Sequence, residues 1–412
     1  MHSAPAAPAV APAHEPPRGG PDGARPLRIA RVSVGYPPRR CGWSHHAAAL
    51  SAAQAAAGHD VHVFQPHPGV AGAERLTVHH VPHGPLPVEP GGSLRRVRFA
   101  WRAARALDRL AAAGTSPDVV HVHGDVPELI PLAGLVRRRG AALVLTLHGG
   151  LSQRPRYRRA ARVWLPRADG IIAVSDATRA EVVALGVPAD RVVTISSGVD
   201  TRFFHPASPS ARGAVRARLG VPPDAMVWVA VGRLAPVKGL EYLVSAAGRL
   251  PHLAAGAVVA VLGDGPERAA LEAHATRQAG GADLRFLGSV DRAALREWLT
   301  AADAMVLPSV TLPGQREGTP TAVLEAMSMG LPVVVTDSGG SAAAIEALPG
   351  LTVVPERNAA ALADAMTRLT ADPALRARVA AANLARATTR DWRHVAAAVD
   401  AFYGRMLARR LP

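Results

Sequence analysis

The stretch AMVWVAVGRLAPVKGLEYLV, residues 225 to 244, contains one strand, one turn and the start of one helix. Its first eight residues are almost all apolar and include β-branched and aromatic types, which predicts a strand buried on both faces. Gly232, a turn that contains proline, and Gly239 then lead into a second apolar stretch. Such a unit is typical of a parallel β-sheet covered by helices.

The same unit recurs along the chain, with Ala- and Leu-rich helical stretches between the apolar runs. Strands are predicted at residues 27–34, 60–64, 118–123, 141–147, 170–175 and 191–196, and again at 225–232, 256–263, 283–288, 303–308, 331–336 and 351–355. The expected fold class is therefore α/β, with two doubly wound parallel sheets. Ligands bind at the carboxyl ends of such strands, so we expect a site in the cleft between the two domains.

The length of 412 residues also predicts two domains, because a domain with a single hydrophobic core is usually much shorter. The first 26 residues lack a basic start and a leucine-rich centre, which predicts a disordered tail and not a signal peptide. The predicted divisions are a tail at 1–26, an N-terminal domain at 27–199, a linker at 200–212, a C-terminal domain at 213–390 and a C-terminal helix at 391–412.

Composition and charge narrow the classes of protein. The only cysteine, Cys41, excludes an intrachain disulfide framework, and no apolar run reaches the roughly 18 residues that span a bilayer. The formal net charge is +15, of which +11 falls in residues 1–198. This field favours anionic partners such as nucleic acid, acidic lipid or phosphorylated substrates; a solvated Arg-rich surface is the alternative.

The turn after the strand at 225–232 contains the only lysine among 47 Lys and Arg residues. Arg233 and Lys238 flank this turn, and two cations with neighbouring glycines at the carboxyl end of a parallel strand suit a diphosphate. A single lysine where all other cations are arginine indicates a need for a compact, flexible point charge. The alternative is a solvated loop with two surface cations.

A second cluster is GQREGTPTAVLEAMSMGLPVVVTDSGG, residues 314–340. Thr319 and Pro320 predict the N-cap and the first residue of a helix whose free amides would form an anion site. Glu317 lies just before this helix and Glu325 within it, with seven residues between them. A carboxylate among apolar neighbours must be neutralised, paired or bonded to ligand hydroxyls. A structural ion pair at Glu325 and a solvated acid at Glu317 are the alternatives.

Histidines follow or occupy two strands of the first half. His148 comes directly after the strand at 141–147, where a ligand is expected, although a core position is the alternative. His121 and His123 share one strand face, and they have no acidic or Cys partner at ligand spacing, so no metal site is predicted. We expect His123 on the acceptor side and His121 in the packing.

Together these residues resemble the donor site of the retaining GT-B glycosyltransferases of family 4. The pattern G-R-x4-K-G at 232–239 followed by E-x7-E at 317–325 is a specific combination, and the resemblance extends over residues 27–411. It implies the GT-B fold, in which two Rossmann-like domains face a cleft and the C-terminal helix returns towards the N-terminal domain. The N-terminal domain would bind the acceptor and the C-terminal domain the nucleotide sugar.

The resemblance also implies roles for individual residues. Arg233 and Lys238 would grip the donor diphosphate and stabilise the leaving nucleotide. Glu317 would contact the donor sugar, and Glu325 would hold the ribose hydroxyls. His148 would face the donor sugar and the acceptor. The other donor-binding positions that it implies are Gly42, Val290, Gly318, Thr319, Pro320 and Thr321.

Two positions depart from the family pattern. Cys41 replaces the first glycine of the family's glycine-pair loop, here within YPPRRCGWSHH, and Ser197 replaces the usual Asn before Gly-Val-Asp. A side chain at Cys41 narrows the space beside the diphosphate. A catalytically silent scaffold is therefore kept as an alternative.

The function implied by the resemblance is retaining transfer of a hexose-type sugar from a nucleotide-diphosphate sugar to a hydroxyl acceptor, with no metal or other cofactor. The biosynthesis of a cell-surface polysaccharide or of a glycolipid would use such a step. The alternatives are a soluble acceptor such as a sugar phosphate or natural product, and a nucleic-acid-binding protein, for which no reader motif is present. A nicotinamide oxidoreductase would need G-x-G-x-x-G after the first strand, which is missing.

Two basic segments, residues 93–110 and 154–167, bear on the acceptor and on localisation. They suit a phosphorylated or lipid-linked acceptor, or peripheral docking of a cytoplasmic protein at the anionic inner face of the membrane. The alternative is a basic solvated helix with Phe99 and Trp101 in the core.

Overall fold

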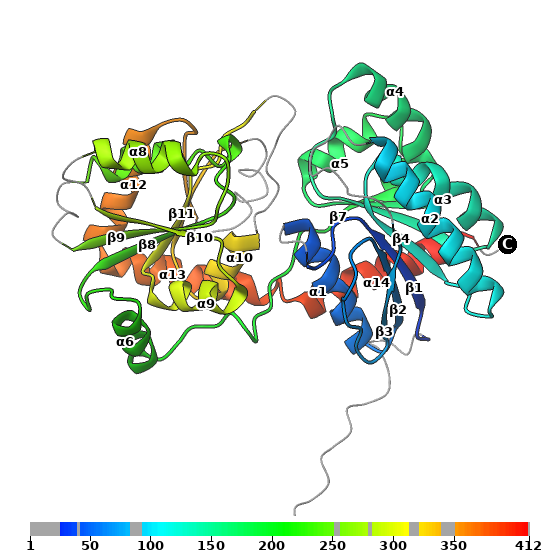
Figure 1. Ribbon diagram of the computed structural model, residues 1–412, viewed down its shortest axis with the longest axis horizontal. Coiled ribbons are helices and arrows are strands. Elements are labelled where there is room, and N and C mark those ends of the chain that lie inside the picture. Colours follow the sequence, from blue (N-terminus) through cyan, green and yellow to red (C-terminus); the bar gives the residue numbers. More distant parts are fainter. Residues whose placement is uncertain are drawn as a thin grey trace, which may run out of the picture.

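The computed structural model describes residues 25–38, 42–82, 93–250, 256–278, 282–312, 321–338 and 351–410. Figure 1 shows two α/β halves side by side, each with a central sheet and helices on both faces. The predicted tail up to residue 24 lies outside the described residues, as does Cys41.

The N-terminal half is built on a seven-stranded sheet in the order β3-β2-β1-β4-β5-β6-β7. All neighbouring strands in it are parallel. The strands are β1 (Arg28–Ser33), β2 (Asp60–Gln65), β3 (Leu76–His80), β4 (Val119–Gly124), β5 (Ala142–Leu147), β6 (Gly170–Ala173) and β7 (Val192–Thr194).

Six of these strands confirm the sequence prediction, and β3 was missed. β3 is an edge strand that pairs with β2 alone, and only its first residue is buried. Its sequence LTVHH lacks the continuous apolar run that marks a strand covered on both faces.

Helices cover both faces of this sheet. The N-terminal half contains α1 (Gly42–Ala56), α2 (Ser93–Ala112), α3 (Val126–Arg138), α4 (Pro155–Trp164) and α5 (Asp176–Val183), with short 3-10 turns at Leu165–Arg167 and Ala189–Arg191. One core cluster joins the sheet to α2, α3 and α5, and another joins its opposite face to α1. No helix within the described ranges is long and apolar enough to cross a membrane.

The C-terminal half has a six-stranded parallel sheet in the order β10-β9-β8-β11-β12-β13. Its strands are β8 (Met226–Val231), β9 (Ala257–Leu262), β10 (Asp283–Gly288), β11 (Ala304–Leu307), β12 (Val333–Thr336) and β13 (Leu351–Val354). Each of them lies where the sequence predicted a strand. The two doubly wound sheets therefore confirm the predicted fold class.

Two further core clusters fill the C-terminal half. Its helices are α6 (Pro209–Arg218), α7 (Leu240–Ala247), α8 (Arg268–Arg277), α9 (Arg292–Ala301), α10 (Thr321–Ser328), α12 (Ala359–Ala371) and α13 (Pro373–Thr388), with a 3-10 turn at Pro236–Lys238. One cluster packs α9 and α10 on the sheet, and the other packs α7, α8 and α12 on the opposite face. Figure 1 shows α10 on the side of its domain that faces α1.

The last helix, α14 (Trp392–Ala408), returns to the N-terminal half and packs beside α1 (Figure 1). Its buried Tyr403 hydroxyl lies 2.5 Å from Nδ1 of His121 and 3.5 Å from a guanidinium nitrogen of Arg31. Arg31 is fully buried and also donates to Ser51 and Gln54. A polar network inside the N-terminal domain therefore holds the C-terminal end of the chain.

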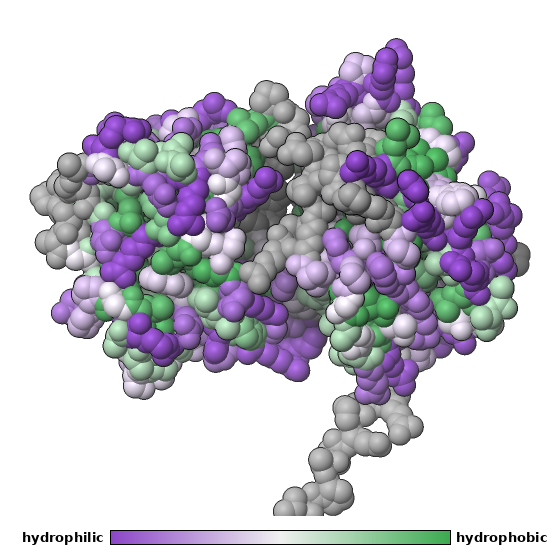
Figure 2. Space-filling model, viewed as in Figure 1, coloured by the Kyte–Doolittle hydropathy of each residue, from purple (hydrophilic) through white to green (hydrophobic). Residues whose placement is uncertain are grey.

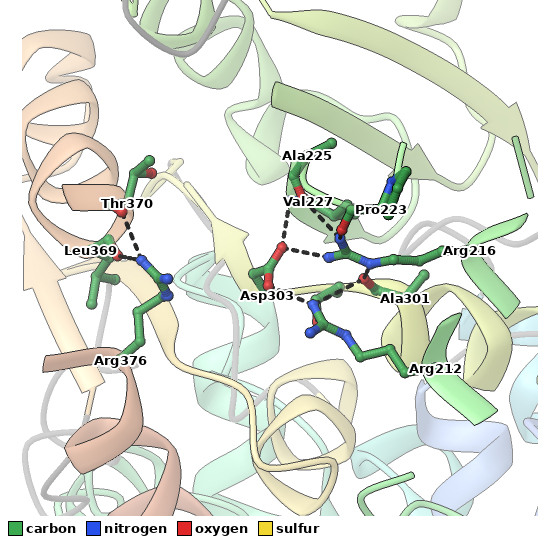
Figure 3. Close-up of polar contacts among 11 residues, drawn as sticks. Arg212, Arg216, Pro223, Ala225, Val227, Ala301, Asp303, Leu369, Thr370 and Arg376 are labelled. Atoms are coloured by element: carbon green, nitrogen blue, oxygen red, sulfur yellow. Dashed lines mark hydrogen bonds and ion pairs between the residues drawn. The ribbon is translucent and has the colours of Figure 1, made fainter. Parts of the chain in front are cut away.

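Helix α6 is attached to the C-terminal sheet by two arginines and one carboxylate (Figure 3). Asp303 accepts hydrogen bonds from Arg212, from Arg216 at 2.7 Å and from the backbone N–H of Val227 at 2.8 Å. The side chain of Arg216 is only 6% exposed and also donates to three backbone carbonyls. Breaking such a buried pair leaves an uncompensated charge.

We expect Asp303→Ala to lower the free energy of unfolding by about 3 to 5 kcal/mol, because Arg216 loses its counter-ion inside the protein. Urea unfolding followed by circular dichroism measures this loss. The matched control is Glu297→Ala, which breaks the exposed pair with Arg218 at 2.7 Å. This control should cost less than about 1 kcal/mol, and equal losses in the two variants would contradict the prediction.

Candidate active site

A cleft of about 750 Å³ lies between the two halves and is lined by residues of both. Figure 2 shows the surfaces of the two domains on either side of this region. The residues come mainly from loops at the carboxyl ends of parallel strands, as expected for open α/β sheets. The predicted site residues that line it are Gly42, His148, Arg233, Lys238, Val290, Thr321 and Glu325.

Arg233 and Lys238 lie in the tight turn that follows β8. Gly239, which ends this turn, has a left-handed backbone with φ of 56°, and a Cβ there would lie 2.2 Å from the carbonyl oxygen of Pro308. A Cβ on Gly263, after β9, would lie 1.8 Å from the carbonyl oxygen of Gly232. The loops after three neighbouring strands therefore pack backbone against backbone, which holds both cations at the cleft.

Glu325 lies on α10 and is 8% exposed, at the edge of the cleft. Burial raises the pKa of its carboxyl to about 7, although the positive charge of Arg292 acts in the opposite direction. Among the described residues, no hydrogen-bond donor to this carboxylate is recorded, and Arg292 is the one charged group that acts on it. The carboxylate is therefore suited to accept hydrogen bonds from hydroxyl groups of a ligand.

Arg292 is a cleft residue that the sequence analysis missed. It is the first residue of α9, directly after Asp291, whose side chain caps that helix by accepting from the N–H of Ala294 at 2.8 Å. Its guanidinium pairs with Asp200 at 2.8 Å and lies 4.4 Å from the ring centroid of Phe203. Its position after the predicted strand at 283–288 could have marked Arg292 as a cleft residue, but arginine is so common in this chain that one more did not stand out.

The opposite wall of the cleft contains His148 and Trp43. The Trp43 ring stacks on His148 with centroids 5.4 Å apart and planes inclined by 24°. His46 contacts the same imidazole edge-on at 4.8 Å, and its Nδ1 lies 2.8 Å from the hydroxyl oxygen of Ser197. Burial lowers the pKa of His148 to about 3, so this imidazole is neutral at ordinary pH. The sequence analysis also missed Trp43 and His46.

His123, which was expected on the acceptor side, is not among the described residues that line the cleft, and lies one layer behind His148. It is fully buried, and its Nδ1 lies 3.0 Å from Nε2 of His148. The reason is that β4 is flanked by β1 and β5, and the rings of His46, His121 and His148 cover the His123 ring. Among the described residues, no three His, Cys, Asp or Glu side chains are arranged to hold a metal ion.

The alternative given for the two aromatic residues of α2, a position in the core, holds for one of them. Phe99 is buried in the core, but Trp101 is 46% exposed, with the guanidinium of Arg105 lying 3.7 Å from its ring centroid. Four other predicted site residues lie outside the described residues: Glu317, Gly318, Thr319 and Pro320.

Two family models match the chain. The model described as Glycosyltransferase Family 4 matches residues 41–203, and the model described as Glycosyl transferases group 1 matches residues 212–386. The two matches therefore fall on the N-terminal and C-terminal halves, and the second contains Arg233, Lys238 and Glu325.

Curated relatives match most of the chain. A D-inositol 3-phosphate glycosyltransferase of Frankia alni is 32% identical over 364 residues, which cover 82% of this chain and 86% of the relative. A glycogen synthase of Mycobacterium tuberculosis is 32% identical over 410 residues, which cover 92% of this chain and 94% of the relative.

Solved structures show the same architecture. Sucrose-phosphate synthase from Thermosynechococcus elongatus has a TM-score of 0.77 and 23% identity, covering 93% of this chain and 100% of that structure. HepE of Anabaena in complex with UDP-glucose has a TM-score of 0.69 and 20% identity, covering 92% and 100%. From the family models, the relatives and the fold together, the chain belongs to the GT-B glycosyltransferases of family 4, and it is a nucleotide-sugar-dependent glycosyltransferase.

Proposed function

We propose that this chain is a retaining hexosyltransferase that moves a sugar from a nucleotide-diphosphate donor to the hydroxyl of a phosphorylated or lipid-linked acceptor. The observation that carries the proposal is the convergence of Arg233, Lys238 and Glu325 from one domain and His148 from the other on a single cleft. The complex of HepE with UDP-glucose supports a donor of this class.

The proposed chemistry is cleavage of a glycosyl-phosphate bond, during which negative charge grows on the departing nucleotide. Arg233 and Lys238 stabilise that charge as fixed cations, so the proposal needs no metal or other cofactor. The first amides of α10, near Thr321, add to this stabilisation. Attack on the face from which the nucleotide departs would retain the configuration of the sugar.

Each remaining residue has a positioning role in the proposal. Glu325 accepts hydrogen bonds from the ribose hydroxyls, and Glu317 contacts the donor sugar. His148 lies at the junction of donor sugar and acceptor. Val290 and its neighbour Ser289 present their loop after β10 to the base, and Gly42 allows the donor phosphates to approach α1.

The acceptor side of the proposal rests on α2 and α4. These helices contain six and four arginines, against one acidic residue. The exposed large apolar side chains of the described residues also lie on them: Leu94 at 86%, Trp101 at 46% and Val163 at 53%. Figures 1 and 2 show that the protruding α4 is largely hydrophilic. Exposed apolar side chains within a basic surface suit peripheral docking at an anionic membrane, from the cytoplasmic side.

The main experiment is a thermal-shift screen of nucleotide-diphosphate sugars, repeated on Lys238→Ala and Glu325→Ala. We expect one donor to stabilise the wild type and each variant to bind it about ten- to a hundredfold more weakly, because each loses a charge-assisted hydrogen bond. Lys238→Arg should also lose transfer activity. The control is Arg277→Ala, on the exposed end of α8 outside the cleft. If no nucleotide sugar stabilises the wild type, the proposal fails.

The affinity for the nucleotide sugar should fall as pH falls through 7. The Glu325 carboxyl has a pKa of about 7, and its ionised form accepts charge-assisted hydrogen bonds from the ribose through both oxygens, whereas protonation turns one of these oxygens into an O–H donor. Its ionised fraction drops about tenfold from pH 8 to pH 6, so the dissociation constant should rise about tenfold. Isothermal titration calorimetry measures this change. Glu325→Gln should bind weakly with no such slope, and an unchanged slope in that variant would refute the assignment.

Binding to lipid vesicles tests the acceptor side. The full chain should co-sediment with phosphatidylglycerol vesicles at low salt and dissociate at high salt, because each arginine near the surface contributes about 1 kcal/mol. Replacing Leu94 and Trp101 by Ser should weaken this binding, and phosphatidylcholine vesicles are the control. No binding to the anionic vesicles would favour a soluble acceptor.

A further inference from the structure

His123 and His148 form a buried pair at the wall of the cleft. Nδ1 of His123 lies 3.0 Å from Nε2 of His148, and the two rings stack with centroids 5.2 Å apart and planes inclined by 29°. In this contact only one of the two nitrogens can carry a proton. One proton lies between them, and the tautomer of His148 depends on which of the two histidines carries it.

Both imidazoles are neutral, so each carries one N–H. Burial lowers the pKa of both, and for His123 the neighbouring His121 and Arg31 act in the same direction. If the shared proton is on Nδ1 of His123, then Nε2 of His123 is unprotonated. If the shared proton is on Nε2 of His148, Nε2 of His123 must carry an N–H instead.

The surroundings of His123 favour the first arrangement. Its Nε2 is buried and has no hydrogen-bond partner among the described residues. A buried N–H without an acceptor is rarer than an acceptor without a donor. The Nε–H of the fully buried Arg31, which pairs with His121 across β1 and β4, already lacks an acceptor within the described part of the chain. A second buried N–H without an acceptor in this cluster would lower the stability of the folded protein further.

The cleft side of His148 completes the argument. Its Nδ1 makes no hydrogen bond to any described residue, and the ring lines the cleft. Trp43 stacks on the ring at 5.4 Å, and His46 contacts it edge-on at 4.8 Å. Because aromatic rings enclose it, the imidazole is held with Nε2 towards His123 and Nδ1 available to a ligand.

We infer that His123 is a positioning residue: it donates its Nδ1–H to Nε2 of His148, so His148 keeps its own proton on Nδ1. The cleft then receives an N–H donor and not a basic lone pair. On the proposed function, on which this inference rests for the identity of the substrate, His148 donates to an oxygen of the sugar and does not remove the proton of the acceptor hydroxyl.

Nitrogen-15 NMR of the histidine side chains tests the tautomer directly, on the full chain without substrate. The signals of His148 are assigned by their loss in His148→Gln. We expect Nδ1 of His148 to be protonated and Nε2 to be bare. In His123→Asp the carboxylate only accepts, so the proton should move to Nε2. A wild-type His148 with its proton mainly on Nε2 would overturn the inference.

Steady-state kinetics provide the second readout. His123→Leu removes the donor at similar volume and should lower kcat at least about tenfold with little change in KM for the donor. His123→Asn, whose amide can donate from the same place, should recover most of the rate. The matched control is His121→Leu: His121 is equally buried on β4 and its ring also contacts His123, but its hydrogen bonds go to Thr146 and Tyr403 and not to His148. Melting temperatures check that each variant is folded.

Two kinetic outcomes would overturn the inference: an unchanged kcat in His123→Leu, or an equal loss of kcat in His121→Leu. Failure of the proposed function is separate. In that case no nucleotide sugar is turned over by any form of the protein, whereas the NMR result is unaffected because it requires no activity.

Discussion

The two halves of the molecule are joined where the chain crosses twice between them, and the two walls of the cleft are tied together at this point. The N–H of Val199 donates to the carbonyl of Arg390 at 2.9 Å, and the N–H of Trp392 donates back to Val199 at 3.2 Å. Asp391 lies between them and accepts from Thr201 and Arg393. Although burial acts in the opposite direction, these hydrogen bonds lower the pKa of Asp391 to about 2. The carboxylate is therefore ionised at any ordinary pH, and the outgoing and returning segments stay paired.

The crossing also contacts the wall of the cleft that contains His148. Trp392, the first residue of α14, contacts the ring of His46 edge-on at 5.0 Å, and His46 in turn contacts His148. His46 is bonded to Ser197, two residues before Val199. Ser197, which stands where the family usually has Asn, thus connects the segment next to the crossing with the histidine cluster. Further along α14, Tyr403 joins the same cluster through His121.

The two walls of the cleft supply different chemistry for a physical reason. The C-terminal wall presents cations on short, glycine-packed turns, which suits a ligand that arrives with fixed negative charge. The N-terminal wall presents a neutral imidazole enclosed by aromatic rings, where burial suppresses protonation. A ligand that spans the cleft would meet positive charge on one wall and a neutral imidazole on the other.

The local sequence alone was enough to predict the strands of both sheets and part of the cleft. The twelve predicted strands are present, and most of them carry the apolar run expected of a strand covered on both faces. Arg233, Lys238 and His148 were found because they follow such runs. The edge strand β3 and the cleft residues Arg292, Trp43 and His46 have no such local mark. Only the tertiary structure decided that Arg292 lies near Glu325, and that His123 lies behind His148 and not in the cleft. Those relations join residues far apart in the chain through the packing of loops and rings, and side-chain burial is set by neighbours that no single stretch of sequence contains.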